Sequence, residues 1–286
     1  MRSEFLFVFV FVICSCLPGK SGYVTNSDIV KNMETDTASS DVFYSSYKIG
    51  NFSNGEEMIV RRYGEGHNFF HAVFLIGALH GNEEGAKKSI NVMEDHIKNN
   101  PSVVPDSTSV FVLNPANNTN IRTILGIDPN RDFLDTKLNE TRAISAFTQT
   151  LNDEWEHVTI ISAHQYNDEA RGTKGIGWVL PLYKLLPEGE KLLDAKILIQ
   201  RDIHYTNPQA SQFLALEFAK ILNFSYEPMW KGGEMYPGEY IHFISNLKKS
   251  INMIEYEIPE SKKNLTDEIK KGLIKFIQGV LNGRNQ

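Results

Sequence analysis

Long apolar runs and amphipathic segments alternate along most of the chain. Four nearly continuous apolar runs stand out: 69–79 (FFHAVFLIGAL), 109–115 (SVFVLNP), 157–164 (HVTIISAH) and 250–259 (SINMIEYEIP). Runs of this kind are typical of strands buried on both faces of a sheet. Residues 42–50 and 56–64 flank the turn sequence NFSNG and predict a further pair of strands.

Helical spacing of apolar residues marks the segments between these strands. Residues 84–98 place Ile90, Met93 and Ile97 on one helical face. The other predicted helices are 141–151, 209–222 and 266–281. Strands that alternate with helices in this way predict a three-layer α/β/α sandwich with a mixed, mostly parallel sheet.

Composition narrows the class of protein. The chain has 286 residues, of which 41% are hydrophobic, and this is enough for one large domain, expected over 44–286. A net charge of −6 and the lack of any Lys or Arg run argue against nucleic acid as a partner. No apolar stretch is long enough for an internal membrane-spanning helix.

The N-terminus predicts export. Residues 1–22 have the pattern of a secretory signal peptide, with an apolar stretch over 5–13, and a polar linker over 23–43 follows. The sequence ICSC resembles a relaxed bacterial lipobox in which Cys16 would carry a lipid anchor to the membrane. A plain signal cleaved a few residues later is the alternative. We therefore expect a secreted, periplasmic or cell-envelope protein without an internal disulfide.

Candidate chemistry gathers at the ends of the predicted strands. His80 and Glu83 follow the first apolar run, His164 ends the third, and Glu257 lies near the end of the fourth. In sheets of this class, ligands collect beyond the carboxyl ends of the strands. Two His and one Glu form a zinc ligand set that leaves one position for water. Gly81 would permit a tight backbone between the first two ligands.

The motifs around these residues resemble those of the zinc carboxypeptidase family of metallopeptidases, and most of all the bacterial murein peptide amidases. The family patterns G-x-H-G-x-E, N-P-D-G then R, G-V-D-L-N-R-N-F, P-E-T, S-x-H, P-G-S and E-x-P have ordered counterparts here. The counterparts are GALHGNE, NPANNTNIR, GIDPNRDF, NETRAI, ISAH, YPGEY and EIPE. The resemblance extends over about residues 44–259.

This resemblance implies a role for each matching residue. His80, Glu83 and His164 would bind one Zn²⁺ ion. Glu257 would be the catalytic base, with Glu255 as its rival two residues earlier. Arg122 would stabilise the oxyanion. Asn130 and Arg131 would bind a substrate carboxylate, because the guanidinium fork matches that group.

The sequence departs from the family pattern near the substrate. Pro129 and Asp132 replace the family's Leu and Asn on either side of the Asn-Arg pair. Tyr236 is the best candidate for the family's mobile tyrosine. Tyr240 is a candidate for the substrate pocket. Glu239 stands where the family often has Ser, and it could favour a substrate amine.

Together these features predict a secreted zinc metallopeptidase that hydrolyses an amide bond near a substrate carboxylate. Its substrate would be a peptide or muropeptide, which makes it a carboxypeptidase or a murein tripeptide amidase acting on cell-wall peptides. An acylamino-acid deacylase of the aspartoacylase or succinylglutamate desuccinylase kind is an alternative, because those enzymes share H-G-N-E, N-P and D-x-N-R elements. An inactive carboxypeptidase-like binding lipoprotein is another.

Overall fold

A computed structural model gives the fold of the chain. It describes residues 43–64, 70–166, 198–202, 225–226, 239–245, 247 and 251–282. The predicted signal peptide with Cys16, all but the last residue of the predicted linker, the helix expected over 209–222 and Tyr236 lie outside the described residues.

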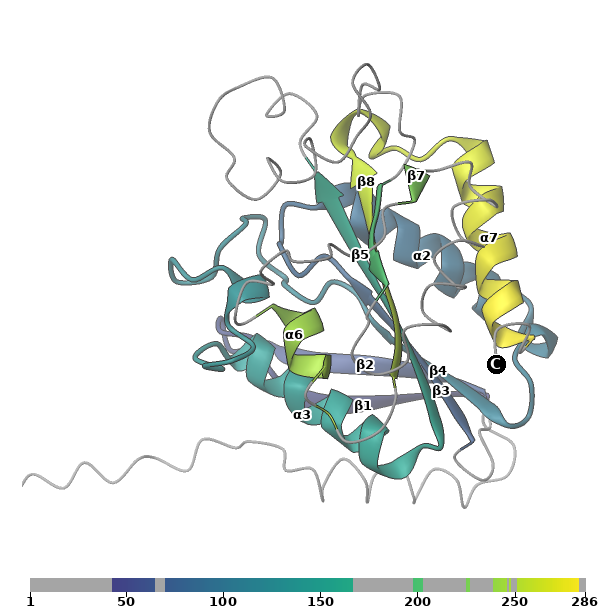
Figure 1. Ribbon diagram of the computed structural model, residues 1–286, viewed down its shortest axis with the longest axis horizontal. Helices are drawn as coiled ribbons and strands as arrows, with labels where there is room; N and C mark the ends of the chain where they lie inside the picture. The colour runs from purple at the N-terminus through teal and green to yellow at the C-terminus, as the bar shows by residue number, and fades with distance from the viewer. Residues whose placement is uncertain are drawn as a thin grey trace, which may run out of the picture.

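The described strands form a mixed sheet (Figure 1). Its eight strands are β1 (Tyr44–Asn51), β2 (Glu57–Tyr63), β3 (His71–Gly77), β4 (Thr108–Leu113), β5 (His157–Tyr166), β6 (Leu198–Asp202), β7 (Ser225–Tyr226) and β8 (Ile251–Pro259). They lie in the order β1-β2-β4-β3-β5-β8-β6-β7. The central strands β4, β3, β5 and β8 are parallel, whereas β2 and β6 pair with them in antiparallel fashion. The predicted mixed, mostly parallel sheet is therefore confirmed.

Helices cover both faces of this sheet (Figure 1). The helices are α2 (Glu84–Asn99), α3 (Asn139–Glu154), α6 (Tyr240–Ser245) and α7 (Asp267–Leu281), with short 3₁₀ turns η2 (Pro101–Val103), η3 (Pro129–Arg131) and η6 (Glu260–Lys262). One apolar core joins α2 and α7 to the sheet, and a second joins α3 and α6 to the opposite face. This is the expected three-layer arrangement.

Side-chain alternation along each central strand supplies both cores. In β3, Val73 and Leu75 pack with α2 and α7, whereas Phe74 and Ile76 pack with α3 and α6. Because successive strand residues point to opposite faces, a strand between two helical layers must be apolar throughout. This requirement explains the continuous apolar runs in the sequence.

Helix boundaries follow local capping signals. The side chain of Thr266 accepts a hydrogen bond from the backbone N–H of Ile269, and Asp267 and Glu268 lie in the first turn of α7. Both features stabilise a helix N-terminus. None of the helices in the described part of the chain is long and apolar enough to cross a bilayer.

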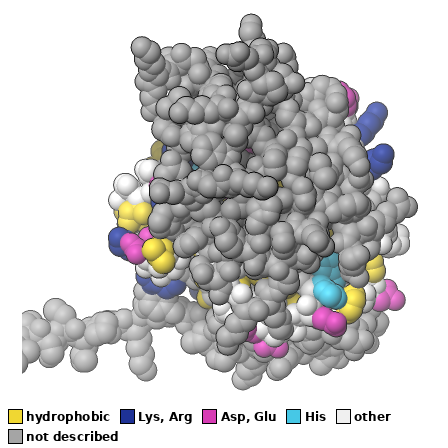
Figure 2. All heavy atoms as spheres, viewed as in Figure 1, with side chains coloured by type: hydrophobic (Ala, Val, Ile, Leu, Met, Phe, Trp, Pro, Cys, Tyr) yellow, Lys and Arg dark blue, Asp and Glu magenta, His cyan; other side chains and the backbone are white. Residues whose placement is uncertain are grey.

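The segment between β4 and α3 projects from the sheet beyond the carboxyl ends of the parallel strands (Figure 1). Figure 2 shows apolar, basic and acidic side chains gathered at the left of the molecule, where this segment lies. Ile121, Leu125 and Leu134 are exposed apolar residues of the segment. The candidate site lies at the base of this projection.

Candidate active site

A short turn after β3 presents His80 and Glu83. Gly81 within this turn donates its backbone N–H to the carbonyl oxygen of Ile121 (3.0 Å). A Cβ atom at Gly81 would lie 1.9 Å from the carbonyl oxygen of Thr119. Glycine is therefore required because another backbone segment packs directly on the turn. This contact joins the β4–α3 segment to the turn that carries the predicted ligands.

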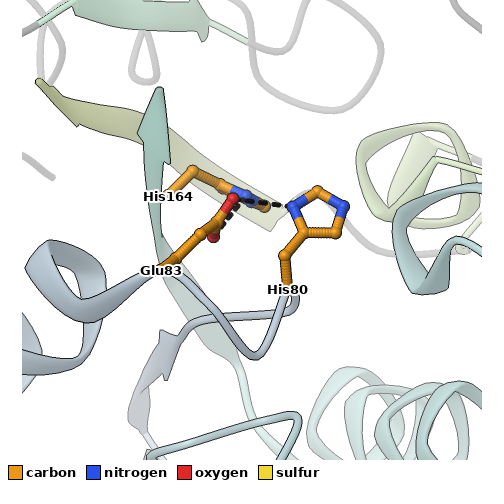
Figure 3. A group of neighbouring side chains, drawn as sticks. All are labelled: His80, Glu83 and His164. Atoms are coloured by element: carbon orange, nitrogen blue, oxygen red, sulfur yellow. Dashed lines mark hydrogen bonds and ion pairs between the residues drawn. The ribbon is translucent and has the colours of Figure 1, made fainter. Parts of the chain in front are cut away.

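His80, Glu83 and His164 converge in the structure (Figure 3). Nδ1 of His80 lies 2.7 Å from Oε1 of Glu83, and Nδ1 of His164 lies 3.4 Å from Oε2 of the same carboxylate. One potential ligand atom from each residue lies within 4.8 Å of the others. All three residues are only 3% exposed. The tertiary fold thus brings together the three residues that the sequence marked as candidate ligands.

The outer nitrogen of each imidazole has its own carboxylate partner. Nε2 of His80 lies 2.8 Å from Oδ1 of Asp128. Nε2 of His164 lies 3.1 Å from Oε1 of Glu255 and 3.2 Å from Oγ of Ser162. Such partners fix the tautomer and orientation of a ligating histidine. They leave Nδ1 of both rings directed at Glu83.

Burial and charge oppose each other in this cluster. Burial disfavours the ionised form of Glu83, but the adjacent His80 and His164 outweigh it and lower its pKa to about 2. Burial also disfavours the imidazolium forms of the two histidines, yet the neighbouring carboxylates raise both pKa values, that of His164 by the larger amount. The carboxylate and the two imidazoles therefore stabilise each other's charged forms.

The donor set fits a metal ion such as zinc. Two imidazole nitrogens and one carboxylate are a known zinc ligand set. Oε2 of Glu83 is buried and has no hydrogen-bond partner within the described structure. Its nearest charged partner is Nδ1 of His164 at 3.4 Å. A buried carboxylate oxygen that accepts no hydrogen bond is costly, and a cation at this point would reduce that cost.

Asp128 connects the cluster to Arg122. Nη2 of Arg122 lies 3.1 Å from Oδ2 of Asp128, whose other oxygen contacts His80. Burial opposes ionisation of Asp128, but the hydrogen bond and charge of His80, together with the nearby Arg122 and Arg131, outweigh burial. The pKa of the Asp128 carboxyl is therefore lowered. The predicted oxyanion residue therefore lies beside the cluster, with its side chain 40% exposed.

Asn130 and Arg131 lie in the η3 turn next to the start of α6. Asp128 caps this turn by accepting a hydrogen bond from the backbone N–H of Asn130 (2.9 Å). Oδ1 of Asn130 accepts from the backbone N–H of Tyr240 (3.3 Å). Nη1 of Arg131 lies 3.0 Å from Oε1 of Glu239. The predicted substrate clamp is thus tied to the residues that precede and begin α6.

Asp132, which departs from the family pattern, has a structural position. It is buried, and its carboxylate accepts hydrogen bonds from the backbone N–H groups of Lys137 and Leu138 and from the hydroxyl of Thr141. These contacts join the η3 turn to the first turn of α3. The departure therefore fixes the clamp segment to the fold.

Tyr240 lies elsewhere than expected for a substrate-binding side chain. It is 1% exposed, its hydroxyl lies 2.6 Å from Oγ1 of Thr148 in α3, and its ring packs on Phe133. The ring fills the space between α6 and α3, so the Tyr240 side chain belongs to the apolar core on that face of the sheet. Only its backbone N–H reaches the clamp.

Glu255 and Glu257 extend from β8 on the same face as His164. Parallel pairing aligns Glu255 with Ser162 and Glu257 with His164. Both glutamates are buried, at 6% and 4% exposure. Glu255 contacts Nε2 of His164. Strand register therefore places both the predicted base and its rival on β8 beside the strand that carries His164.

The sequence did not single out Asp128 or the pairing of Glu255 with a histidine ring. Asp128 lies in the motif GIDPNRDF, two residues before Asn130. This motif was recognised in the sequence, but the contact of Asp128 with His80 was not predicted. The partner of His164 depends on strand register, which the sequence does not specify. Both missed features are contacts between segments far apart in the chain.

The similarity of this chain to known proteins was found in its structure and not in its sequence. No family model matches the sequence, and no curated protein matches it. Solved structures with a similar fold include carboxypeptidase A from Helicoverpa armigera, with 10% identity and a TM-score of 0.58 over 91% of this chain and 73% of that one. A metallo-carboxypeptidase from Pseudomonas aeruginosa has 11% identity and a TM-score of 0.57 over 90% and 68%.

The murein-tripeptide amidase MpaA from Escherichia coli O157 has 14% identity and a TM-score of 0.51 over 83% of this chain and 91% of that one. The fold is therefore that of the zinc carboxypeptidases, as the motifs predicted. The cluster of His80, Glu83 and His164 within this fold is compatible with a metal site.

Proposed function

We propose that this protein is a zinc-dependent metallopeptidase that hydrolyses an amide bond near a substrate carboxylate. The observation that carries the proposal is the buried convergence of His80 and Glu83, from the turn after β3, with His164 near the carboxyl end of β5. His80, Glu83 and His164 would hold the ion. When bound, zinc would supply a Lewis-acid centre that polarises a carbonyl group and acidifies water.

Glu257 is the proposed catalytic base. Its carboxylate would take a proton from the attacking water and deliver it to the nitrogen of the leaving amine. Its alignment with His164 across β5 and β8 supports this role. Glu255 would instead orient the ring of His164, because it lies 3.1 Å from Nε2.

Arg122 and the η3 turn would position the substrate. The guanidinium of Arg122 would stabilise negative charge on the carbonyl oxygen. Asn130 and Arg131 would bind the substrate carboxylate, which the planar guanidinium matches in shape and charge. Tyr236 remains the proposed counterpart of the tyrosine that the family carries near the P-G element.

The proposed substrate is a peptide or muropeptide, and the proposed location is outside the cytoplasm. The similar structure of the murein-tripeptide amidase MpaA supports a cell-wall peptide as the substrate.

The N-terminal sequence supports export, with Cys16 as the proposed lipid anchor. Metabolic labelling with a radioactive fatty acid, compared between the full chain and Cys16→Ala, tests the anchor: equal labelling contradicts it.

Digestion of L-Ala-γ-D-Glu-diaminopimelate by the zinc-loaded protein tests the activity. Release of diaminopimelate, followed by mass spectrometry, is expected for the wild type and not for Glu257→Gln. N-acetylaspartate and N-succinylglutamate serve as parallel substrates. Cleavage of these alone would identify a deacylase. Stoichiometric zinc binding without cleavage of any substrate, C-terminal peptides included, would identify a binding protein.

A further inference from the structure

Arg131 and Glu239 form an ion pair next to the candidate cluster. Nη1 of Arg131 lies 3.0 Å from Oε1 of Glu239, and the Glu239 side chain is only 6% exposed. Arg131 belongs to the η3 turn, whereas Glu239 directly precedes α6. The guanidinium proposed to bind the substrate carboxylate therefore already faces a carboxylate of the protein.

Glu239 is held in this position from several directions. Its carbonyl oxygen accepts a hydrogen bond from the backbone N–H of Phe243 (3.0 Å). The next residue, Tyr240, donates its backbone N–H to Asn130 and bonds through its hydroxyl to Thr148. These contacts fix the backbone at Glu239, and movement of its buried carboxylate away from Arg131 would break their ion pair.

A substrate carboxylate on Arg131 would consequently lie beside a second negative charge. Like charges at close range disfavour each other, and burial strengthens the effect. An ammonium group on the same substrate residue would remove the imbalance, because it could pair with Glu239 while the carboxylate pairs with Arg131. Two opposite charges on the substrate would then match two opposite charges on the protein.

We propose that Glu239 is a specificity-determining residue that selects substrates whose leaving amino acid carries an ammonium group beside its carboxylate. The chemical class is the diamino acids, attached to the rest of the substrate through one amine and retaining the other. This inference rests on the proposed function, since it assigns the substrate carboxylate to Arg131. It adds an ammonium site to the leaving-group side of the pocket.

Two tripeptides that differ in one ammonium group test the selection. They are L-Ala-γ-D-Glu-diaminopimelate and its analogue ending in 2-aminopimelate. The wild type is expected to favour the first by at least about tenfold in kcat/KM. Glu239→Gln should lose most of this preference by slowing cleavage of the diaminopimelate substrate while leaving the analogue unchanged or faster. Equal kcat/KM values of the wild type for both substrates would overturn the inference.

A matched control uses another buried glutamate that pairs with an arginine. Glu94 binds Arg61 on the opposite side of the sheet, so Glu94→Gln removes a buried carboxylate far from η3. It should keep the wild-type ratio between the two substrates. A ratio that falls equally in both variants would show a general loss of packing and would contradict a specific role of Glu239.

Binding of N-acetylated amino acids separates this inference from the proposed function. Isothermal titration calorimetry of the zinc-loaded Glu257→Gln variant uses mono-N-acetyl-diaminopimelate, which keeps one ammonium group, and N-acetyl-2-aminopimelate, which keeps none, and it needs no turnover. A Kd at least about tenfold lower for the diaminopimelate derivative, lost when Glu239→Gln is added, supports the ammonium site even if neither tripeptide is cleaved. Equal Kd values overturn the inference, whereas absence of cleavage alone counts against the proposed function.

Discussion

Asp128 lies against the outer nitrogen of His80, with 2.8 Å between Oδ1 and Nε2. The same carboxylate accepts a hydrogen bond from Arg122 through its other oxygen and caps the η3 turn through Asn130. One side chain therefore joins a proposed metal ligand, the proposed oxyanion residue and the proposed substrate clamp.

Loss of this carboxylate should weaken metal binding. Asp128→Ala is expected to lower zinc affinity by about 10- to 100-fold, because His80 loses the partner that orients its ring. Competition with a chromophoric zinc chelator measures the effect. Asp135→Ala is the matched control, since Asp135 is an exposed carboxylate of the same segment that pairs with Lys137. An unchanged zinc affinity in Asp128→Ala would contradict a role in orienting His80.

The two buried glutamates of β8 should separate metal binding from proton transfer. Glu257→Gln is expected to keep zinc affinity and lose about 10²- to 10⁴-fold in kcat, because the amide cannot accept the proton. Glu255→Gln should weaken zinc binding, because it alters the partner of His164, and should retain turnover at saturating zinc. Chelator competition and steady-state kinetics on both variants check this. The opposite pattern would make Glu255 the base.

The buried carboxylate of Asp132 should stabilise the clamp segment. Asp132→Ala removes three hydrogen bonds at the start of α3, and the free energy of unfolding is expected to fall by about 1–2 kcal/mol. Asp132→Asn keeps an acceptor oxygen and should recover part of this loss. Urea denaturation of the three proteins measures it, and equal midpoints would show that these contacts do not stabilise the fold.

His71 should make the stability depend on pH below neutrality. Burial, together with the nearby His157, lowers the pKa of His71 from 6.5 to about 4. Between these values the unfolded chain binds a proton that the native state does not. The stabilising contribution is therefore present above pH 6.5 and is lost as the pH falls towards 4. Since one pKa unit corresponds to about 1.4 kcal/mol, the loss should approach about 3 kcal/mol.

His71→Gln measures this contribution by difference. The free energy of unfolding of the wild type should fall more steeply than that of the variant between pH 6.5 and 4.5. His96→Gln, in the last turn of α2, controls for the removal of a histidine elsewhere. Parallel pH profiles for the wild type and His71→Gln would rule out His71 as the source.

Most strand and helix segments within the described residues could be predicted because local patterns determine them, whereas β6, β7 and α6 were not predicted. The apolar runs became β3, β4, β5 and β8, and the residues marked as a candidate zinc set came together. Tyr240 could not be placed, because an aromatic residue near a motif packs equally well in a pocket or in a core. Its burial under α6 depends on the space beside Phe133 and Thr148.

The sequence by itself determined the alternation of strands and helices, the type of sheet and the candidate metal-binding residues. Apolar periodicity and ligand chemistry are properties of single segments, so they can be read in order along the chain. Only the tertiary structure decided which carboxylate faces which partner: Asp128 with His80, Glu255 with His164 and Glu239 with Arg131. These pairs depend on strand register and loop packing. The paired residues are between 48 and 108 positions apart in the sequence, yet their nearest atoms lie about 3 Å apart.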